Sequence, residues 1–189
     1  MFFKRCHWHL FSQKRKVLTV HRAKKYQKFS KVLWFAALFS FCMFLRLQVY
    51  SLAYVPSESM MPTLQKGDCL FATRYDKTNI QRYDVVLFDY PDNEHLCFVK
   101  RVIGIPGDTI EIKKGKVYAN GVLLKDNFTA ELSNDDGIFQ VPEGCFFMLG
   151  DNRNHSHDSR FWENTFVRQD QIRGRVKCIL FPFSRAGTV

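Results

Sequence analysis

Three short clusters in the chain carry side chains that could together perform acyl transfer. They cover residues 56–63, with serines at positions 57 and 59, residues 100–108, which begin with a lysine, and residues 150–160. A serine hydroxyl needs a base to become a nucleophile, and a lysine can be that base only where apolar surroundings lower its pKa. Each cluster alone has a structural explanation, as a loop, a turn or an ion pair. Together they suggest a serine nucleophile with Lys100 as its general base.

The surroundings of Lys100 fit this chemistry. The apolar run 96–99 precedes the lysine, and Val102 and Ile103 follow the adjacent Arg101. Side chains alternate between the two faces of a β-strand, so Lys100 and Arg101 would lie on opposite faces. We therefore expect Lys100 to face the interior and Arg101 to face solvent.

The three clusters, in this order, resemble the motif blocks of type I signal peptidases, the leader peptidases of bacteria. The resemblance extends from about residue 56 to residue 176. It implies a membrane-bound serine endopeptidase that removes N-terminal signal peptides from exported pre-proteins. Such an enzyme cuts after small residues through an acyl-enzyme, with a Ser/Lys dyad that corresponds to Ser59 and Lys100 here.

The same resemblance implies supporting roles for four further residues and no metal or other cofactor. Ser57 resembles the serine whose hydroxyl lines the oxyanion hole, and Ser156 resembles the residue that orients the lysine. Asp158 and Arg160 resemble an ion pair that braces the site.

The chain departs from the family pattern in two places. After an aromatic pair the family usually continues with Gly and then Val-Pro, whereas here Phe161-Trp162 is followed by Glu163. The segment between residues 108 and 150 is also short, so the large extra β-domain of some members is expected to be missing.

Two histidines near the third cluster allow another interpretation. His155 and His157 are spaced so that both imidazoles would lie on one face of a strand, which could suggest a metal site. Neither is needed once Lys100 is the base, and lysine at this position disfavours the endoplasmic-reticulum relatives, which have histidine there.

Other functions stay open. The chain could be a specialised relative that processes one precursor, of a conjugation, pilus or organelle inner-membrane type. It could also be a catalytically silent, membrane-tethered β module that binds secreted chains. A self-cleaving repressor shares the Ser/Lys dyad, but residues 1–31 lack a helix-turn-helix pattern.

Most of the chain after residue 55 predicts short β-strands separated by turns. Residues 109–112, 116–119 and 122–124 predict a three-stranded meander with Asn120-Gly121 at its second turn. Further strands are expected at residues 69–73, 85–90, 97–102, 145–149 and 174–180, and a polar loop is expected at 127–137. The predicted fold class is mostly β, a single-span N-terminal transmembrane helix followed by a compact antiparallel β catalytic domain.

The apolar segment before residue 55 is a candidate membrane anchor. Residues 32–45 carry no charge, but a span needs roughly 20 residues, so the expected anchor covers residues 32–54. Arg46 would then extend its side chain to the far boundary, and Tyr50 and Tyr54 would suit the interface. A buried core helix and a cleavable signal peptide are the alternatives.

The charge distribution predicts the orientation of the chain in the membrane and the class of its partners. Ten basic residues lie within positions 1–31, which predicts a basic cytoplasmic tail there and an extracytoplasmic domain at 55–189, in the plasma (inner) membrane. From residue 47 onward 17 basic residues face 18 acidic ones, which disfavours a nucleic-acid partner. The expected partners are signal-peptide-bearing pre-proteins and the lipid bilayer.

The cysteines give no pattern. No C-x-x-C pair occurs, and Cys69, Cys97, Cys145 and Cys178 could pair in three ways or remain free thiols.

Overall fold

A computed structural model of the chain describes residues 28–45 and 49–189. Two compact units divide the chain, Met1–Leu45 and Arg46–Val189, and each is considered separately. The expectations for residues 1–27 of the basic tail and for Arg46 lie outside the described residues.

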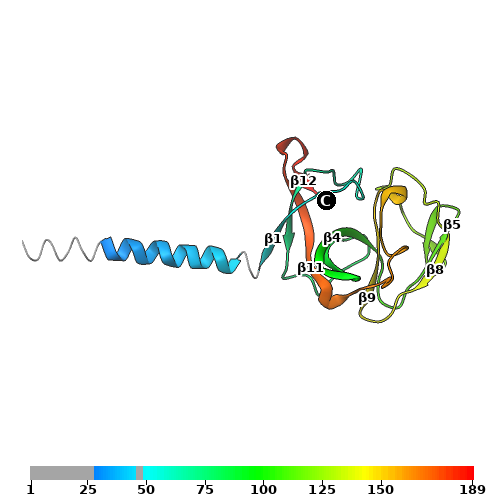
Figure 1. Cartoon of the computed structure of the whole chain (residues 1–189), viewed down its shortest axis with the longest axis horizontal. Helices are drawn as coiled ribbons and strands as arrows, with labels where there is room; N and C mark the ends of the chain where they lie inside the picture. The colour runs from blue at the N-terminus through cyan, green and yellow to red at the C-terminus, as the bar shows by residue number, and fades with distance from the viewer. Residues whose placement is uncertain (1–27, 46–48) are drawn as a thin grey trace, which may run out of the picture. The chain divides into compact units, whose positions relative to one another are not determined.

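The described part of the first unit is one helix, Lys28–Leu45, drawn in blue in Figure 1. Its side chains are apolar nearly all round, and large ones such as Trp34, Phe35 and Phe39 are exposed. Its 18 residues would extend about 27 Å, close to the thickness of a bilayer's hydrocarbon core. Length and composition therefore suit a membrane span, and the described residues 28–45 are exposed rather than buried as in a core helix.

The helix ends earlier than the sequence suggested. Residues Tyr50–Tyr54 form strand β1, which pairs antiparallel with β2 (Cys69–Thr73) from Tyr50↔Thr73 to Tyr54↔Cys69. The Tyr50 ring stacks on Phe71 at 5.7 Å, and Ala53 packs against the core. Extending the anchor to residue 54 was therefore wrong for this stretch, because its backbone hydrogen bonds are made within a sheet.

The second unit contains a large antiparallel sheet with strand order β1-β2-β11-β3-β4-β9-β10, and β12 pairs with β11. The bounds not yet given are Val85–Tyr90 for β3, Asn93–Gly104 for β4, Cys145–Leu149 for β9, Val167–Arg168 for β10, Ile172–Phe181 for β11 and Gly187–Thr188 for β12. Three short 3-10 helices interrupt the loops, η1 at Arg153–His155, η2 at Gln169–Gln171 and η3 at Phe183–Arg185.

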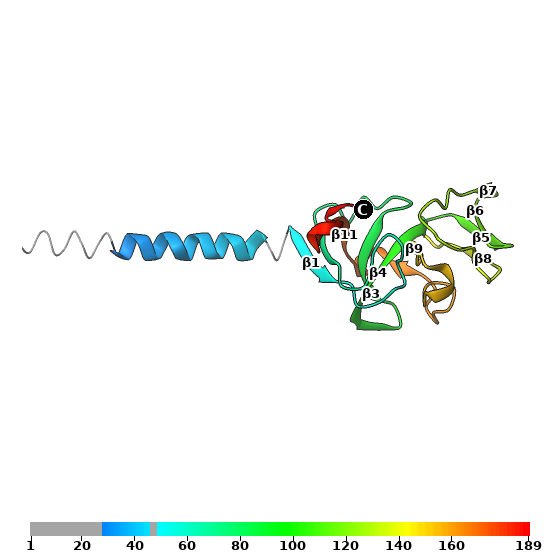
Figure 2. The ribbon, with the colours of Figure 1, turned by 90° about the horizontal axis from the view of Figure 1, so that it is seen from above.

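A smaller four-stranded sheet has the order β7-β6-β5-β8, with bounds Thr109–Lys113 (β5), Lys116–Ala119 (β6), Val122–Leu123 (β7) and Gly137–Gln140 (β8). The predicted meander is confirmed as β5, β6 and β7. Asn120 and Gly121 both have positive φ, +51° and +79°, as a two-residue hairpin turn requires. In Figures 1 and 2 this sheet lies beyond β9, at the end of the second unit opposite β1.

Three apolar clusters hold the sheets together. The first joins β2, β3 and β11 and contains the fully buried Met60 and Leu64 from the loop that follows β1. The second packs Trp162 between β3, β4 and β9, and the third joins the small sheet to β9 through Phe147. The expected fold class, mostly antiparallel β after one apolar helix, is confirmed.

Candidate active site

Ser59 lies on a loop that its neighbours bury. The loop leaves β1 at Val55, whose N–H donates to the Asp68 carbonyl (2.9 Å), while the Gly67 N–H donates back to the Val55 carbonyl (2.9 Å). Within the loop, Met60 and Leu64 have no exposed surface. Burial of these two side chains fixes the backbone that follows position 59, and the buried Val55 fixes the backbone that precedes it, so the serine is held by apolar packing rather than by a regular element.

Lys100 comes from the middle of β4, opposite Val86 of β3. Only 4% of the residue is exposed, and its Nζ donates a hydrogen bond to Ser59 Oγ. Burial lowers the pKa of Lys100 to about 8, against the opposing effect of the Asp158 and Asp151 carboxylates. The expectation that Lys100 faces the interior is confirmed, and its amine can be neutral at moderate pH.

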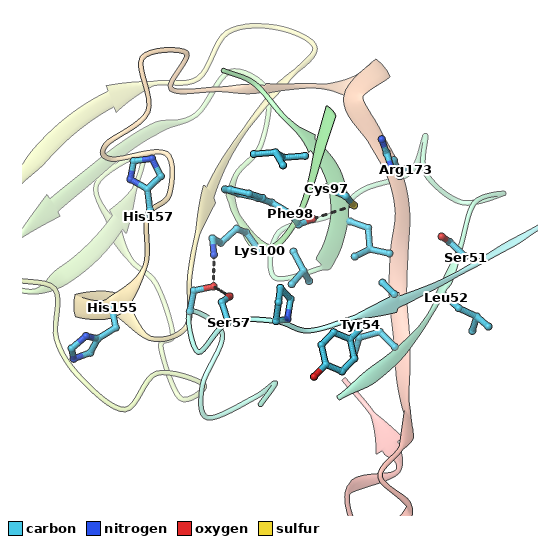
Figure 3. A pocket seen from close by; sticks show the side chains of 17 residues that line it. Ser51, Leu52, Tyr54, Ser57, Cys97, Phe98, Lys100, His155, His157 and Arg173 are labelled. Carbon is cyan, nitrogen blue, oxygen red and sulfur yellow. Dashed lines mark hydrogen bonds between the residues drawn. The ribbon is translucent and has the colours of Figure 1, made fainter. Parts of the chain in front are cut away.

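A pocket of about 700 Å³ opens beside the two residues. Its walls come from residues 51–54 of β1, the start of the serine loop, residues 96–100 of β4, and three side chains with basic groups, His155, His157 and Arg173. In Figure 3, Ser57 and Lys100 lie between Leu52 and Tyr54 on one side and the two histidines on the other. A chain that crossed this pocket would pass the Ser59 hydroxyl.

Ser57 is close to the nucleophile candidate. Its Oγ lies 3.3 Å from Ser59 Oγ, within hydrogen-bond range. A hydroxyl at this position could contribute to binding an oxyanion near Ser59, which is the role that the resemblance implies.

The turn after β9 holds the serine loop in place. The Asn152 N–H donates to the Ser59 carbonyl (3.1 Å), and the Asn152 side-chain amide donates to the Glu58 carbonyl (3.1 Å). Gly150 allows the close approach, because a Cβ there would lie 2.5 Å from the Ser59 carbonyl oxygen and would also clash with Ser156. Sequence reasoning gave Asn152 no role, although it lies inside the third cluster.

Asp158 and Arg160 form a two-pronged ion pair. Arg160 Nε and Nη2 donate to the two Asp158 oxygens at 2.8 and 2.9 Å, and the Gly150 N–H donates to the same carboxylate at 3.0 Å. Asp158 has no exposed surface. The pair thus braces the turn that carries Gly150, Asn152 and Ser156.

Ser156 is 7% exposed and lies beside Gly150. Among the described residues its hydroxyl has no hydrogen-bond partner. Its role in orienting Lys100 therefore stays a prediction.

Arg101 does not face solvent as expected; it is 7% exposed. Its guanidinium donates to both Asp151 oxygens at 2.8 and 2.7 Å and to the Tyr83 carbonyl at 2.9 Å, and it lies 4.2 Å from the Phe128 ring centroid. The strand alternation itself holds, but the sheet is covered on both faces, so Arg101 enters a second buried environment where Asp151 supplies its counter-charge.

The two histidines line the pocket beside Ser59. Within residues 28–45 and 49–189, no group of three or more His, Cys, Asp or Glu side chains is placed to hold a metal ion. His157 Nε2 lies 3.3 Å from the Tyr90 hydroxyl, and the His157 ring is near-parallel to that of Phe161 at 6.3 Å. Cys69, Cys97, Cys145 and Cys178 are free thiols, and Cys97 also borders the pocket.

Comparison with known proteins shows that the chain is similar to members of one family. Residues 27–181 match the family described as signal peptidase, peptidase S26. A probable signal peptidase I-2 of Synechocystis sp. is 38% identical over 142 residues, 71% of this chain and 64% of that protein. The match thus spans slightly less than two thirds of that relative. Signal peptidase I of Bacillus caldolyticus is 39% identical over 158 residues, 75% of this chain and 85% of that protein.

A solved structure is also similar. The crystal structure of a signal peptidase I from Enterococcus faecalis has 35% sequence identity, with a TM-score of 0.47, over 51% of this chain and 95% of that chain.

Proposed function

This chain belongs to the signal peptidase family, peptidase S26, and from this premise we propose that it is a serine endopeptidase that removes N-terminal signal peptides from exported pre-proteins. The observation that carries the proposal is the buried amine of Lys100 in hydrogen-bond contact with the Ser59 hydroxyl, at the wall of an open pocket. A buried lysine whose pKa is lowered and whose amine contacts a serine hydroxyl is a candidate general base for that serine.

The proposed reaction is acyl transfer. Neutral Lys100 accepts the Ser59 hydroxyl proton while Ser59 Oγ attacks the scissile carbonyl, and the Ser59 N–H with the Ser57 hydroxyl binds the resulting oxyanion. The protonated lysine then gives its proton to the leaving amine, which leaves an acyl-enzyme. Water that Lys100 deprotonates attacks the ester, releases the signal peptide and restores Ser59.

The wall of the pocket supports a preference for apolar residues before the cut. Leu70 and Leu87, both almost fully buried, form apolar wall near Ser59, and Val99 of β4 adds to it. An apolar, fixed surface of this kind favours side chains such as Ala over charged ones.

The anchor and its orientation belong to the same proposal. The helix Lys28–Leu45 would hold the enzyme in the bilayer that also holds the signal peptide, which raises the frequency of encounter. The excess of basic residues before the apolar segment supports a cytoplasmic amino terminus in the plasma (inner) membrane, with the unit that contains Ser59 on the opposite side.

The test is cleavage of a precursor that carries a signal peptide by the full chain in detergent, with the cut mapped by mass spectrometry. Ser59→Ala and Lys100→Ala should each abolish cleavage. The matched control is Lys113→Ala, because the Lys113 side chain is exposed on β5. Cleavage after a small residue by wild type and control alone supports the proposal.

Three other results would overturn parts of it. Cleavage that survives both dyad substitutions would show that another group does the chemistry. A wild-type chain that binds but cuts none of a panel of precursors would favour the silent binding module, and cutting of one precursor only would favour the specialised relative.

A further inference from the structure

The two ends of the Ser59 pocket differ in chemistry. Figure 3 places Leu52 and Tyr54 on one side of Ser57 and Lys100, and His155 and His157 on the other. No Asp or Glu side chain lines the pocket, and three of its side chains can carry positive charge besides Lys100. Arg173 is already paired with Asp89, so the histidines are the groups left for a substrate.

The direction of the substrate follows from the proposed function, on which this inference rests. An extended peptide advances about 3.3 Å per residue, so residues before and after the scissile bond extend to opposite sides of Ser59. If the small apolar residues of the signal peptide occupy the side of Leu52 and Tyr54, the first residues of the mature chain pass the histidines.

His157 is held in a defined orientation. The Tyr90 hydroxyl donates its proton to Asp92 Oδ2 at 2.9 Å, so at 3.3 Å His157 Nε2–H is the donor to the Tyr90 oxygen. Asp92 in turn accepts from the Glu163 and Asn164 N–H groups at 3.0 and 2.8 Å. This leaves Nδ1 for a ligand, and a protonated imidazole would donate from it to a carboxylate.

The Asp92 contacts link the histidine to the part of the sequence that departs from the family pattern. Glu163 and Asn164 stand where the family pattern has Gly and Val, and their backbone N–H groups donate to the carboxylate of Asp92, which accepts from Tyr90. The loop after Trp162 thus supports Tyr90 through Asp92, and Tyr90 contacts His157.

We propose that His155 and His157 are specificity-determining residues that contact the first two residues of the mature chain and favour acidic over basic side chains there. At the pocket wall a substrate carboxylate meets two imidazoles and no Asp or Glu side chain, and the Asp92 carboxylate behind Tyr90 is already occupied by the Tyr90 hydroxyl and two backbone N–H groups. A substrate ammonium group would meet imidazoles without a free carboxylate in the wall to pair with.

The experiment compares three peptides with one signal-peptide cleavage site and Asp, Asn or Lys as the second residue after the cut. The full chain in detergent cleaves all three under the same conditions. The measured quantity is the ratio of kcat/KM for the Asp peptide to that for the Lys peptide, because a change in overall activity cancels within each variant. We expect a ratio of about 5 for wild type, the upper range for an exposed charge pair.

The His155→Gln/His157→Gln variant should bring this ratio close to 1. The matched control is His95→Gln, which should keep the wild-type ratio. His95 is exposed on β4 and is not part of the pocket wall. A wild-type ratio near 1, or a ratio that survives in the double variant, would overturn the inference while cleavage itself still supports the proposed function. Absence of cleavage of all three peptides would contradict both.

Discussion

Lys100 Nζ donates a hydrogen bond to Ser59 Oγ from a strand that lies 41 residues further along the chain. The lysine is fixed by β3 and β9 on either side of β4, and the serine by the burial of Met60 and Leu64. Two independent elements therefore hold the two groups together, so the contact does not depend on a flexible side chain finding its partner.

Activity should rise with pH through the titration of Lys100. The lysine acts as a base only when neutral, and burial lowers its pKa to about 8. About a tenth of the lysines are then neutral at pH 7, and each further unit of acid lowers kcat/KM about tenfold. A pH–rate profile on one peptide checks this, and a rate that stays level down to about pH 5 would show that Lys100 is not the base.

The free energy of unfolding should also depend on pH through Lys100. Because its folded-state pKa lies below the unfolded value, the unfolded chain binds more protons between about pH 8 and 10, so the free energy of unfolding falls as the pH falls through that window. Lys100→Met should remove this slope and keep the apolar packing. Urea unfolding at pH 8 and pH 10 measures it, and an equal pH dependence in both proteins would assign the slope to other groups.

The catalytic residues of the site could be predicted from the sequence, but the burial of Arg101 could not. A lysine within an apolar run and a serine cluster suggest a base and a nucleophile, and a family resemblance singles out Ser59 and Lys100. Arg101 was different, because its burial depends on Asp151, fifty positions away, and on the Phe128 ring. Nothing in the local pattern distinguishes an arginine in solvent from one paired across the fold.

Some strands could likewise be predicted from the sequence and others could not. Apolar runs bounded by turns predicted β2, β3 and β9 with their bounds. Strand β1 was missed because residues 47–55 carry no charge and follow the apolar run 32–45 after a single arginine, and hydropathy alone does not separate a span from a strand. Strands β10 and β12 have two residues each, too few for a periodic signal, and β8 alternates only over four.

Breaking the ion pair that braces the turn should unfold the site. Arg160→Ala would leave the fully buried Asp158 without its guanidinium, and we expect a loss of about 3–5 kcal/mol in the free energy of unfolding. Lys113→Ala, which breaks an exposed pair with Glu111, is the matched control and should change stability little. Urea denaturation compares the two, and a similar small effect for both would mean that water or other groups stabilise Asp158.

The orientation of the anchor can be read from intact cells. If the amino terminus is cytoplasmic, a protease added outside spheroplasts should remove an epitope placed after Val189 and leave one placed before Met1 intact. Permeabilised cells are the control, since both epitopes should then be lost. Loss of only the amino-terminal epitope in intact spheroplasts would reverse the proposed topology.

Gly150 offers the sharpest test that the turn after β9 positions the nucleophile. An Ala Cβ there would lie 2.5 Å from the Ser59 carbonyl oxygen and against the Ser156 side chain, and both neighbours are buried, so the serine loop must move. We expect kcat to fall about 100-fold, as for a displacement of about 1 Å, with stability lower by about 1–3 kcal/mol. Gly187→Ala is the control, because its added Cβ meets no atom within 4 Å. Should Gly150→Ala keep wild-type kcat in a folded protein, the close contact with the Ser59 carbonyl would have no part in positioning the nucleophile.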